Sequence, residues 1–146
     1  MPLQVLLVED SPGDVRLTKA AFRDANPSVD LHVATDGVEA MSFLRQQGVN
    51  NHEPRPDLIL LDLNLPRMDG REVLAWIKAD DNLNSIPTAI LTTSDNRDDI
   101  AKVYKLQGNC YLTKPVDLGD FENLVKSIND FWLTKARLPV HNSPSA

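Results

Sequence analysis

The sequence predicts an α/β fold in which five parallel strands form one sheet with helices on both faces. Two observations support this prediction. Short aliphatic runs alternate along the chain with longer stretches whose apolar residues recur every three or four positions. The central run, 58–61, consists of four aliphatic residues, which is typical of a strand buried on both faces of a parallel sheet. This alternation favours strands joined by helical crossovers.

Local signals define each expected element. The elements are, in order, strand 3–8, helix 12–25, strand 29–34, a helix starting at 37, strand 57–62, a helix through 73–77, strand 87–92, helix 97–107, strand 110–113 and helix 118–136. Ser11 and Pro12 open the first helix, because proline suits the first helical turn. Asp69 can cap the helix that follows the third strand. Each helix carries one apolar stripe that is expected to face the sheet.

Two segments are predicted to lack regular structure. Residues 47–56 are polar and contain glycine, asparagine and proline, which indicates a longer loop than most. Residues 138–146 are rich in proline and serine and predict a flexible C-terminal tail. The sequence therefore predicts a single domain over 1–137 followed by this tail.

Composition excludes several classes of function. The net charge of −6, without any stretch rich in lysine and arginine, argues against contact with nucleic acid. No apolar run approaches the length of a membrane span, and the N-terminus lacks the features of a signal peptide. The single cysteine, Cys110, cannot form an internal disulfide. A cytoplasmic protein is therefore expected.

Right-handed crossovers leave few topologies, and a flavodoxin-like, three-layer arrangement with strand order 2-1-3-4-5 is the natural one. Strands 1 and 3 then flank the point where the order reverses, which is where open α/β sheets bind ligands. Glu9 and Asp10 follow strand 1, and Asp62 follows strand 3. Thr92 closes strand 4 and Lys114 closes strand 5.

Carboxylates that converge on one crevice repel one another unless a cation lies among them. Such oxygen-rich sites suit Mg²⁺, with Asp10 and Asp62 as direct ligands, Glu9 through water, and the backbone carbonyl of Asn64 just beyond the strand. Any one of these residues alone is equally explained by a solvated acidic loop. With the hydroxyl of Thr92 and the ammonium of Lys114, they predict a site where an aspartate attacks a phosphoryl group.

Six residues at scattered positions also resemble, in order and spacing, the receiver domains of two-component response regulators (CheY-like proteins). These positions are Glu9-Asp10, Asp62, Thr92 and Lys114-Pro115, and the resemblance spans about 3–128. It implies that Asp62 accepts phosphate from a histidine kinase and that the acidic pair holds Mg²⁺. It also implies that Lys114 contacts the phosphoryl group, and that its peptide bond to Pro115 is cis.

The same resemblance implies a conformational switch. Tyr111 falls at the family's aromatic switch position, so Thr92 would move toward the phosphoryl oxygen and Tyr111 would swing inward behind it. Asn64 and Ser94 occupy two variable positions that, in the family, influence how fast the aspartyl-phosphate hydrolyses. Thr93 departs from the alanine or glycine that is usual there.

Three weaker features resemble the response regulators of cyanobacterial and bacterial phytochromes. They are residues 14–18 in the first helix, the long loop before strand 3, and the ending 131–134 with 138–139. This implies a phytochrome histidine kinase as partner and a homodimer formed through helix 4, strand 5 and helix 5. The candidate interface residues are large and apolar: Tyr104, Phe131, Trp132 and Leu133.

The prediction is therefore a phosphoacceptor signalling protein, not an enzyme with an external substrate. Phosphorylation would shift an equilibrium between two conformations, and an unknown downstream protein or a second copy would recognise the change. One alternative is a dimerisation module that works without phosphate. A phosphatase of the haloacid-dehalogenase type would carry Asp-x-Asp after strand 1, where this chain has Glu-Asp-Ser. A flavin-binding module is disfavoured because Glu9 and Asp10 would repel its phosphate.

Overall fold

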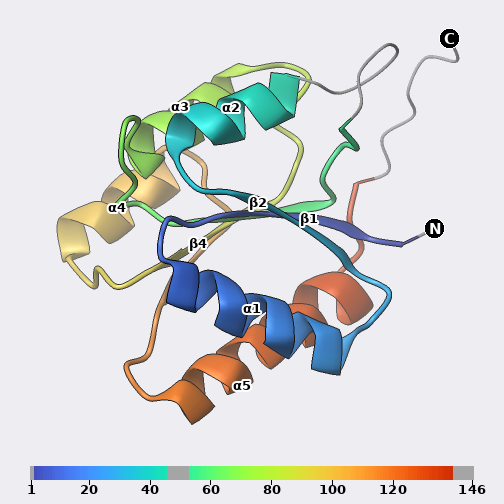
Figure 1. Cartoon of the computed structure of the whole chain (residues 1–146). Coiled ribbons are helices and arrows are strands. Elements are labelled where there is room, and N and C mark those ends of the chain that lie inside the picture. Colours follow the sequence, from blue (N-terminus) through green and yellow to red (C-terminus); the bar gives the residue numbers. More distant parts are fainter. Residues whose placement is uncertain (1, 46–52, 140–146) are drawn as a thin grey trace, which may run out of the picture.

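The computed structural model describes residues 2–45 and 53–139. It contains one five-stranded parallel sheet with the order β2-β1-β3-β4-β5, which confirms the predicted topology (Figure 1). The strands are β1 (Gln4–Val8), β2 (Asp30–Ala34), β3 (Leu58–Leu61), β4 (Thr88–Thr92) and β5 (Cys110–Thr113). The helices are α1 (Pro12–Ala25), α2 (Gly37–Arg45), α3 (Gly70–Ala79), α4 (Arg97–Lys105), α5 (Leu118–Ile128) and the π-helix η1 (Asn129–Lys135). Most of the predicted loop 47–56 and of the predicted tail 138–146 lies outside the described residues.

Helices cover both faces of the sheet and create two separate apolar cores. α1 and α5 pack on one face, while α2, α3 and α4 pack on the other (Figure 1). Successive residues of a strand point to opposite faces, so Val5 and Leu7 enter the core with α1 and α5, and Leu6 and Val8 enter the other. β3 is buried along its whole length, as its four aliphatic residues predict. It therefore forms a rigid support for the segment that follows it.

The helices begin where the sequence places capping side chains. Ser11 caps α1 by accepting a hydrogen bond from the backbone N–H of Asp14. Asp69 caps α3 in the same way, with Arg71 as the donor, which confirms the predicted cap. Each cap satisfies a backbone donor that has no partner within the helix. The caps of α1 and α3 thus fix the loops that leave β1 and β3.

The last helix differs from the prediction of one continuous helix over 118–136. The α-helix ends at Ile128 and continues as the π-helix η1, in which the N–H of Ala136 donates to the carbonyl of Phe131, five residues earlier. The wider turn changes which side chain faces inward. Leu133, five residues after Ile128, is only 9% exposed and joins the core with α1 and α5. An α-helix would have directed Trp132, four residues after Ile128, to that position.

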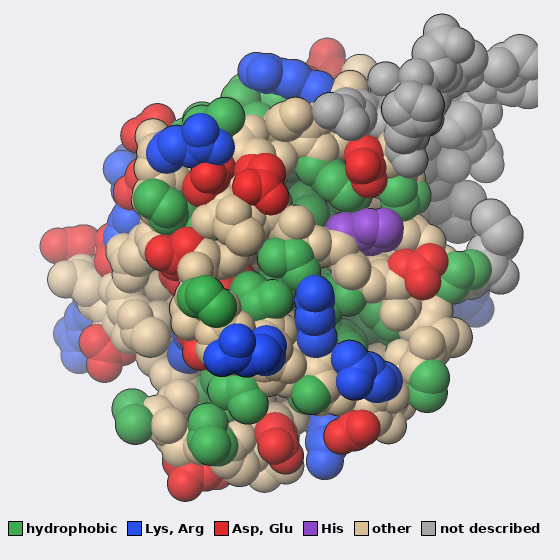
Figure 2. All heavy atoms as spheres, in the orientation of Figure 1, with side chains coloured by type: hydrophobic (Ala, Val, Ile, Leu, Met, Phe, Trp, Pro, Cys, Tyr) green, Lys and Arg blue, Asp and Glu red, His purple; other side chains and the backbone are tan. Residues whose placement is uncertain are grey.

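The surface carries charges of both signs. Figure 2 shows acidic and basic side chains interspersed over one face of the molecule, with apolar side chains scattered between them. This mixture fits the modest net charge of −6. Among the described helices, none is long and apolar enough to cross a membrane.

Candidate functional site

The candidate site lies at the carboxyl ends of the strands, where the sheet fixes the first residue after each strand. The N–H of Asp62 donates to the carbonyl of Val8 at 3.0 Å. The N–H of Lys114 donates to the carbonyl of Thr92 at 2.7 Å. Strand pairing therefore continues through the residues that carry the reactive groups. Their side chains are held at the sheet's edge without relying on a flexible loop.

Three carboxylates meet at this edge, as the sequence predicts. One oxygen each from Glu9, Asp10 and Asp62 lies within 4.8 Å of the others. Glu9 and Asp62 are buried, with 2% and 7% of their surface exposed, while Asp10 is open to solvent. An all-oxygen cluster with one open side has the donor set and the access that Mg²⁺ and similar hard cations require. The residues present therefore fit a divalent cation.

Lys114 places its ammonium group among buried carboxylates. Its Nζ donates to Glu9 Oε2, to Asp14 Oδ2 at 2.9 Å and to Asp62 Oδ2 at 3.1 Å. Burial alone would lower the pKa of Lys114, but its hydrogen bonds to Glu9 and Asp14 and the charge of Asp62 raise that pKa above its usual value. The lysine is therefore a permanent cation beside Asp62.

Burial raises the pKa of Glu9 to about 7, although the hydrogen bond and charge of Lys114 act in the opposite direction. When no cation is bound, burial therefore makes the ionised form of Glu9 costly. A divalent cation would favour its ionised form, because a positive charge beside a carboxylate lowers the pKa.

The loop after β3 turns back sharply and positions Asp62. The N–H of Gly70 donates to the carbonyl of Leu63 at 2.9 Å. A Cβ on Gly70 would lie 2.1 Å from the carbonyl oxygen of Asp62, so only glycine fits. Arg67 adopts a left-handed backbone with φ of 65° and pairs with Asp36 at 2.8 Å. The hydrogen bond from Gly70 to Leu63 and the ion pair between Arg67 and Asp36 therefore both hold this loop in place.

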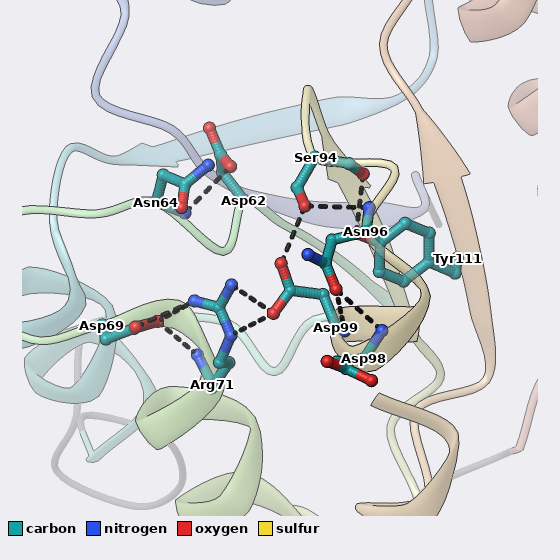
Figure 3. A network of polar contacts seen from close by, with 9 residues as sticks. All are labelled: Asp62, Asn64, Asp69, Arg71, Ser94, Asn96, Asp98, Asp99 and Tyr111. Carbon is teal, nitrogen blue, oxygen red and sulfur yellow. Dashed lines mark hydrogen bonds and ion pairs between the residues drawn. The ribbon is translucent and has the colours of Figure 1, made fainter. Parts of the chain in front are cut away.

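Asp62 itself has a hydrogen-bond donor at each carboxylate oxygen. The backbone N–H of Asn64 donates to Oδ1 at 3.1 Å, a contact visible in Figure 3. Lys114 donates to Oδ2. The carboxylate is therefore oriented from two directions. Asn64 lies on the exposed side, next to Asp62, and the role of its carbonyl as a metal ligand remains a prediction.

Thr92 brings a buried hydroxyl with no hydrogen-bond partner among the described residues. A buried polar atom without a partner is costly and calls for an explanation. Thr92 ends β4, which pairs with β3 beside Asp62. This position fits a hydroxyl that donates a hydrogen bond to an oxygen atom of a group bound at Asp62. Tyr111 is half-buried against the core on the side of α2, α3 and α4, and its hydroxyl donates to the carbonyl of Ser94 at 2.7 Å. The ring thus already lies inward, and the predicted swing itself stays a prediction.

The prediction of a cis peptide bond before Pro115 is wrong for this structure, because no cis bond occurs in the described part of the chain. The trans form is favoured by about 0.5–1 kcal/mol even before proline. With a trans bond, Lys114 still reaches Asp62 at 3.1 Å, so the contacts of the site do not require the cis form.

Comparison with known proteins was decisive for the family. The sequence profile of the response regulator receiver domain matches residues 5–128. The chain belongs to this receiver family. Response regulator Rcp1 from Synechocystis sp. (strain ATCC 27184 / PCC 6803 / Kazusa) is 49% identical over 138 residues, which cover 94% of this chain and 94% of Rcp1.

Two solved receiver structures agree closely with this one. The Mn²⁺-bound form of Rcp1 has a TM-score of 0.89 at 49% identity, covering 95% of this chain and 100% of that one. The phosphorylated cyanobacterial phytochrome response regulator RcpA has a TM-score of 0.91 at 47% identity, covering 96% of this chain and 100% of that one. The receiver therefore belongs to a signalling family of two-component phosphorelays, and its relatives include phytochrome response regulators.

The residues predicted for a dimer interface lie away from the site and do not share one environment in this receiver. Tyr104 on α4 and Phe131 on η1 are 51% and 55% exposed. Trp132 is half-buried and contacts Phe131 edge to face, with ring centroids 5.3 Å apart. Leu133 is 9% exposed and packs in the core with α1 and α5, and its role at an interface stays a prediction.

Three residues of the site region were missed by sequence reasoning. Asp14 binds Lys114, while Arg71 and Asp99 pair with each other across two helices. Asp14 carried a signal, since it sits at the first turn of the helix that opens just after Glu9. Arg71 carried another, because a cation in the first turn of a helix is unfavourable unless carboxylates surround it.

Proposed function

We propose that this receiver accepts a phosphoryl group on Asp62 from a phosphohistidine of a sensor histidine kinase. One observation supports this most directly. The carboxylate of Asp62 lies 3.1 Å from the ammonium of Lys114 and clusters with the carboxylates of Glu9 and Asp10. An acceptor anion beside a fixed cation and a cation-binding cluster has the parts that phosphoryl transfer needs.

The transfer follows from these parts. A carboxylate oxygen of Asp62 attacks phosphorus, the phosphorus–nitrogen bond of the donor histidine breaks, and the leaving imidazole nitrogen takes up a proton. Lys114 offsets the negative charge on the phosphoryl oxygens. The hydroxyl of Thr92, which has no partner in the described structure, can donate to one of those oxygens. Hydrolysis of the acyl phosphate later returns the carboxylate.

Glu9, Asp10, Asp62 and the carbonyl of Asn64 would hold Mg²⁺. Their oxygen donors suit this ion, and the existence of a Mn²⁺-bound form of the related Rcp1 supports binding of a divalent cation. When bound, such a cation would neutralise charge on the acceptor and on the phosphoryl oxygens. Transfer is therefore expected to require the metal.

The partner proposed is a phytochrome histidine kinase. Similarity to Rcp1 and to the phytochrome regulator RcpA over most of the chain supports this choice. Phosphorylation would favour one conformation of the face made by α4, β5 and α5, on which Tyr104 is exposed. A second copy of the chain or an unknown downstream protein would bind there. The protein is proposed to act in the cytoplasm.

Intact mass after incubation with acetyl phosphate tests the proposal. The wild type should gain one phosphoryl group only with Mg²⁺, and Asp62→Asn should gain none. Asp95→Asn is a matched control, since Asp95 is exposed and lies outside the carboxylate cluster. Adding beryllium fluoride, which mimics the acyl phosphate, distinguishes rapid hydrolysis from a site that never accepts a phosphoryl group. If the protein neither gains a phosphoryl group nor binds beryllium fluoride, the alternative of a phosphate-independent dimerisation module is favoured.

Purified kinases test the partner. An autophosphorylated phytochrome should transfer its phosphoryl group to the wild type within seconds to minutes, faster than an unrelated histidine kinase does. Equal or slower transfer from the phytochrome would contradict the assignment of the partner and leave that of Asp62 intact.

A further inference from the structure

A polar network outside the carboxylate cluster joins the beginnings of α3 and α4. Arg71 donates from Nε to Asp99 Oδ1 at 3.0 Å, and its Nη2 lies 2.7 Å from the same oxygen. Its Nη1 contacts both oxygens of Asp69 at 2.9 Å. Figure 3 shows the guanidinium between the two carboxylates. One arginine thus ties the cap of α3 to the first turn of α4.

The network continues into the loop between β4 and α4. The hydroxyl of Ser94 donates to Asp99 Oδ2 at 2.7 Å, and the hydroxyl of Tyr111 donates to the carbonyl of Ser94 at 2.7 Å. Arg71, Asp99, Ser94 and Tyr111 therefore form an unbroken series of contacts across three elements (Figure 3). The series holds Ser94 through both its side chain and its backbone.

The network adjoins the acceptor without touching it. Ser94 follows Thr92 by two residues, so fixing Ser94 restrains the short segment whose hydroxyl must meet the phosphoryl group. Figure 3 shows the Ser94 hydroxyl directed to Asp99, while Asp62 and Asn64 form a separate pair beside it. Arg71 and Asp99 are about one-fifth exposed, so water screens their interaction less than it screens a surface pair. Hydrogen bonding by Ser94 and Arg71 also lowers the pKa of Asp99 below its usual value, which keeps the carboxylate ionised.

We propose that Arg71 and Asp99 are positioning residues that hold the β4–α4 loop, and with it Tyr111, in the arrangement that phosphoryl transfer to Asp62 requires. This inference rests on the proposed function of Asp62. The inward ring of Tyr111 coexists with a Thr92 hydroxyl that has no partner among the described residues, so the loop is set before any phosphoryl group arrives. Neither Arg71 nor Asp99 touches the reacting atoms; both act through Ser94.

Loss of Arg71 should depopulate this arrangement. Asp99 would lose its guanidinium partner, Ser94 would lose a fixed acceptor, and Tyr111 would lose the carbonyl that anchors its hydroxyl. The apparent affinity for a phosphoryl mimic falls in proportion to the fraction of molecules in the competent state. We expect Arg71→Ala to raise the half-saturating concentration of beryllium fluoride about fivefold.

The experiment measures two binding constants and one spectroscopic signal. Calorimetry gives the affinity for Mg²⁺ alone and for beryllium fluoride at saturating Mg²⁺, in the wild type, Arg71→Ala, Arg71→Lys and Arg71→Ala/Asp99→Ala. Fluorine NMR of the fluorotyrosine-labelled protein reports the ring of Tyr111. The chain has two tyrosines, and the Tyr104→Phe variant shows which resonance belongs to Tyr104. Arg97→Ala, which removes an exposed arginine at the start of α4, is the matched control.

The inference expects a specific pattern. Arg71→Ala should bind Mg²⁺ as the wild type does, bind beryllium fluoride about fivefold more weakly and shift the Tyr111 resonance. Arg71→Lys should be intermediate, because lysine keeps the charge but lacks the forked geometry. The double variant should be no worse than Arg71→Ala, since both changes break one series of contacts. Arg97→Ala should match the wild type.

Three results would overturn the inference, for different reasons. If the wild type binds beryllium fluoride and Arg71→Ala binds it equally well with an unchanged Tyr111 resonance, Arg71 has no positioning role. If Arg71→Ala also loses Mg²⁺ affinity to the same extent, its effect is a general loss of structure. A wild type that binds no beryllium fluoride would overturn the proposed function of Asp62 and this inference with it.

Discussion

The ammonium group of Lys114 lies closer to Asp14 than to Asp62, at 2.9 Å against 3.1 Å. Asp14 belongs to the first turn of α1, and 30% of its side chain is exposed. It lies outside the group of carboxylates that could hold a metal ion. The lysine that would assist phosphoryl transfer is therefore shared with a residue outside the carboxylate cluster.

Replacing this partner should speed the uptake of phosphate. In Asp14→Asn, Lys114 keeps Asp62 and Glu9 but loses a competing anion, and a negatively charged donor meets less repulsion. The initial rate of labelling by acetyl phosphate should rise about threefold to tenfold, as expected for removal of an interaction of about 1 kcal/mol. Asp24→Asn, an exposed change on the same helix, is the control. A slower rate would mean that Asp14 orients Lys114 productively.

The hydroxyl of Thr92, which has no hydrogen-bond partner among the described residues, should lower the stability of the protein but strengthen binding of a phosphoryl group. Thr92→Val keeps the shape of the side chain and removes a buried polar atom without a partner. Its free energy of unfolding should rise by about 1 kcal/mol, while beryllium fluoride should bind more weakly. Thr88→Val is the matched control, because the buried hydroxyl of Thr88 donates to the carbonyl of Ile86. Urea unfolding of both variants would contradict this account if Thr92→Val were the less stable.

Glu9 predicts a pH dependence of stability in the metal-free protein. Burial raises its pKa from 4.5 to about 7, so between these values the folded chain binds more protons at Glu9 than the unfolded chain does. The stability from this group is fully present below about pH 4.5 and is lost as the pH rises through about 7. Denaturant unfolding of the wild type in the presence of a metal chelator, measured from about pH 4.5 to about pH 7, should show this loss of stability. Glu9→Gln should remove it, and an unchanged slope in that variant would refute the assignment.

Leu133 and Phe131 should respond in opposite ways to truncation. Leu133→Ala should lower the free energy of unfolding by about 2–3 kcal/mol, because the side chain is buried in the core with α1 and α5. Phe131→Ala should change stability little, since the ring is 55% exposed. If the proposed homodimer uses this end of the chain, sedimentation should show that Phe131→Ala weakens self-association. A dimer unaffected by the change would place its interface elsewhere.

The sheet and the main site residues could be predicted because their signals are local. The four aliphatic residues of β3 predict a buried strand. Because burying a charge is costly, the charged Asp62 at the end of such a strand indicates a functional role. Glu9 and Thr92 follow from the same logic once the strand order is known. Topology alone brings these strand ends to one edge.

The remaining features depend on contacts between distant residues. Lys114 and Asp14 are 100 residues apart, and Arg71 and Asp99 are 28 apart, so no local pattern reveals either pair. The change from α to π winding after Ile128 arises from packing of Leu133 against the core, which helical spacing alone does not encode.

The winding of η1 has a consequence for the outer surface of the protein. Leu133 is the fifth residue after the inward-facing Ile128 and is buried, whereas Phe131 faces solvent. Tightening this segment to α-helical winding would carry Trp132 inward and rotate Leu133 out. The π-helical pitch of these seven residues therefore decides that a partner meeting this end of the chain contacts Phe131 and not Leu133.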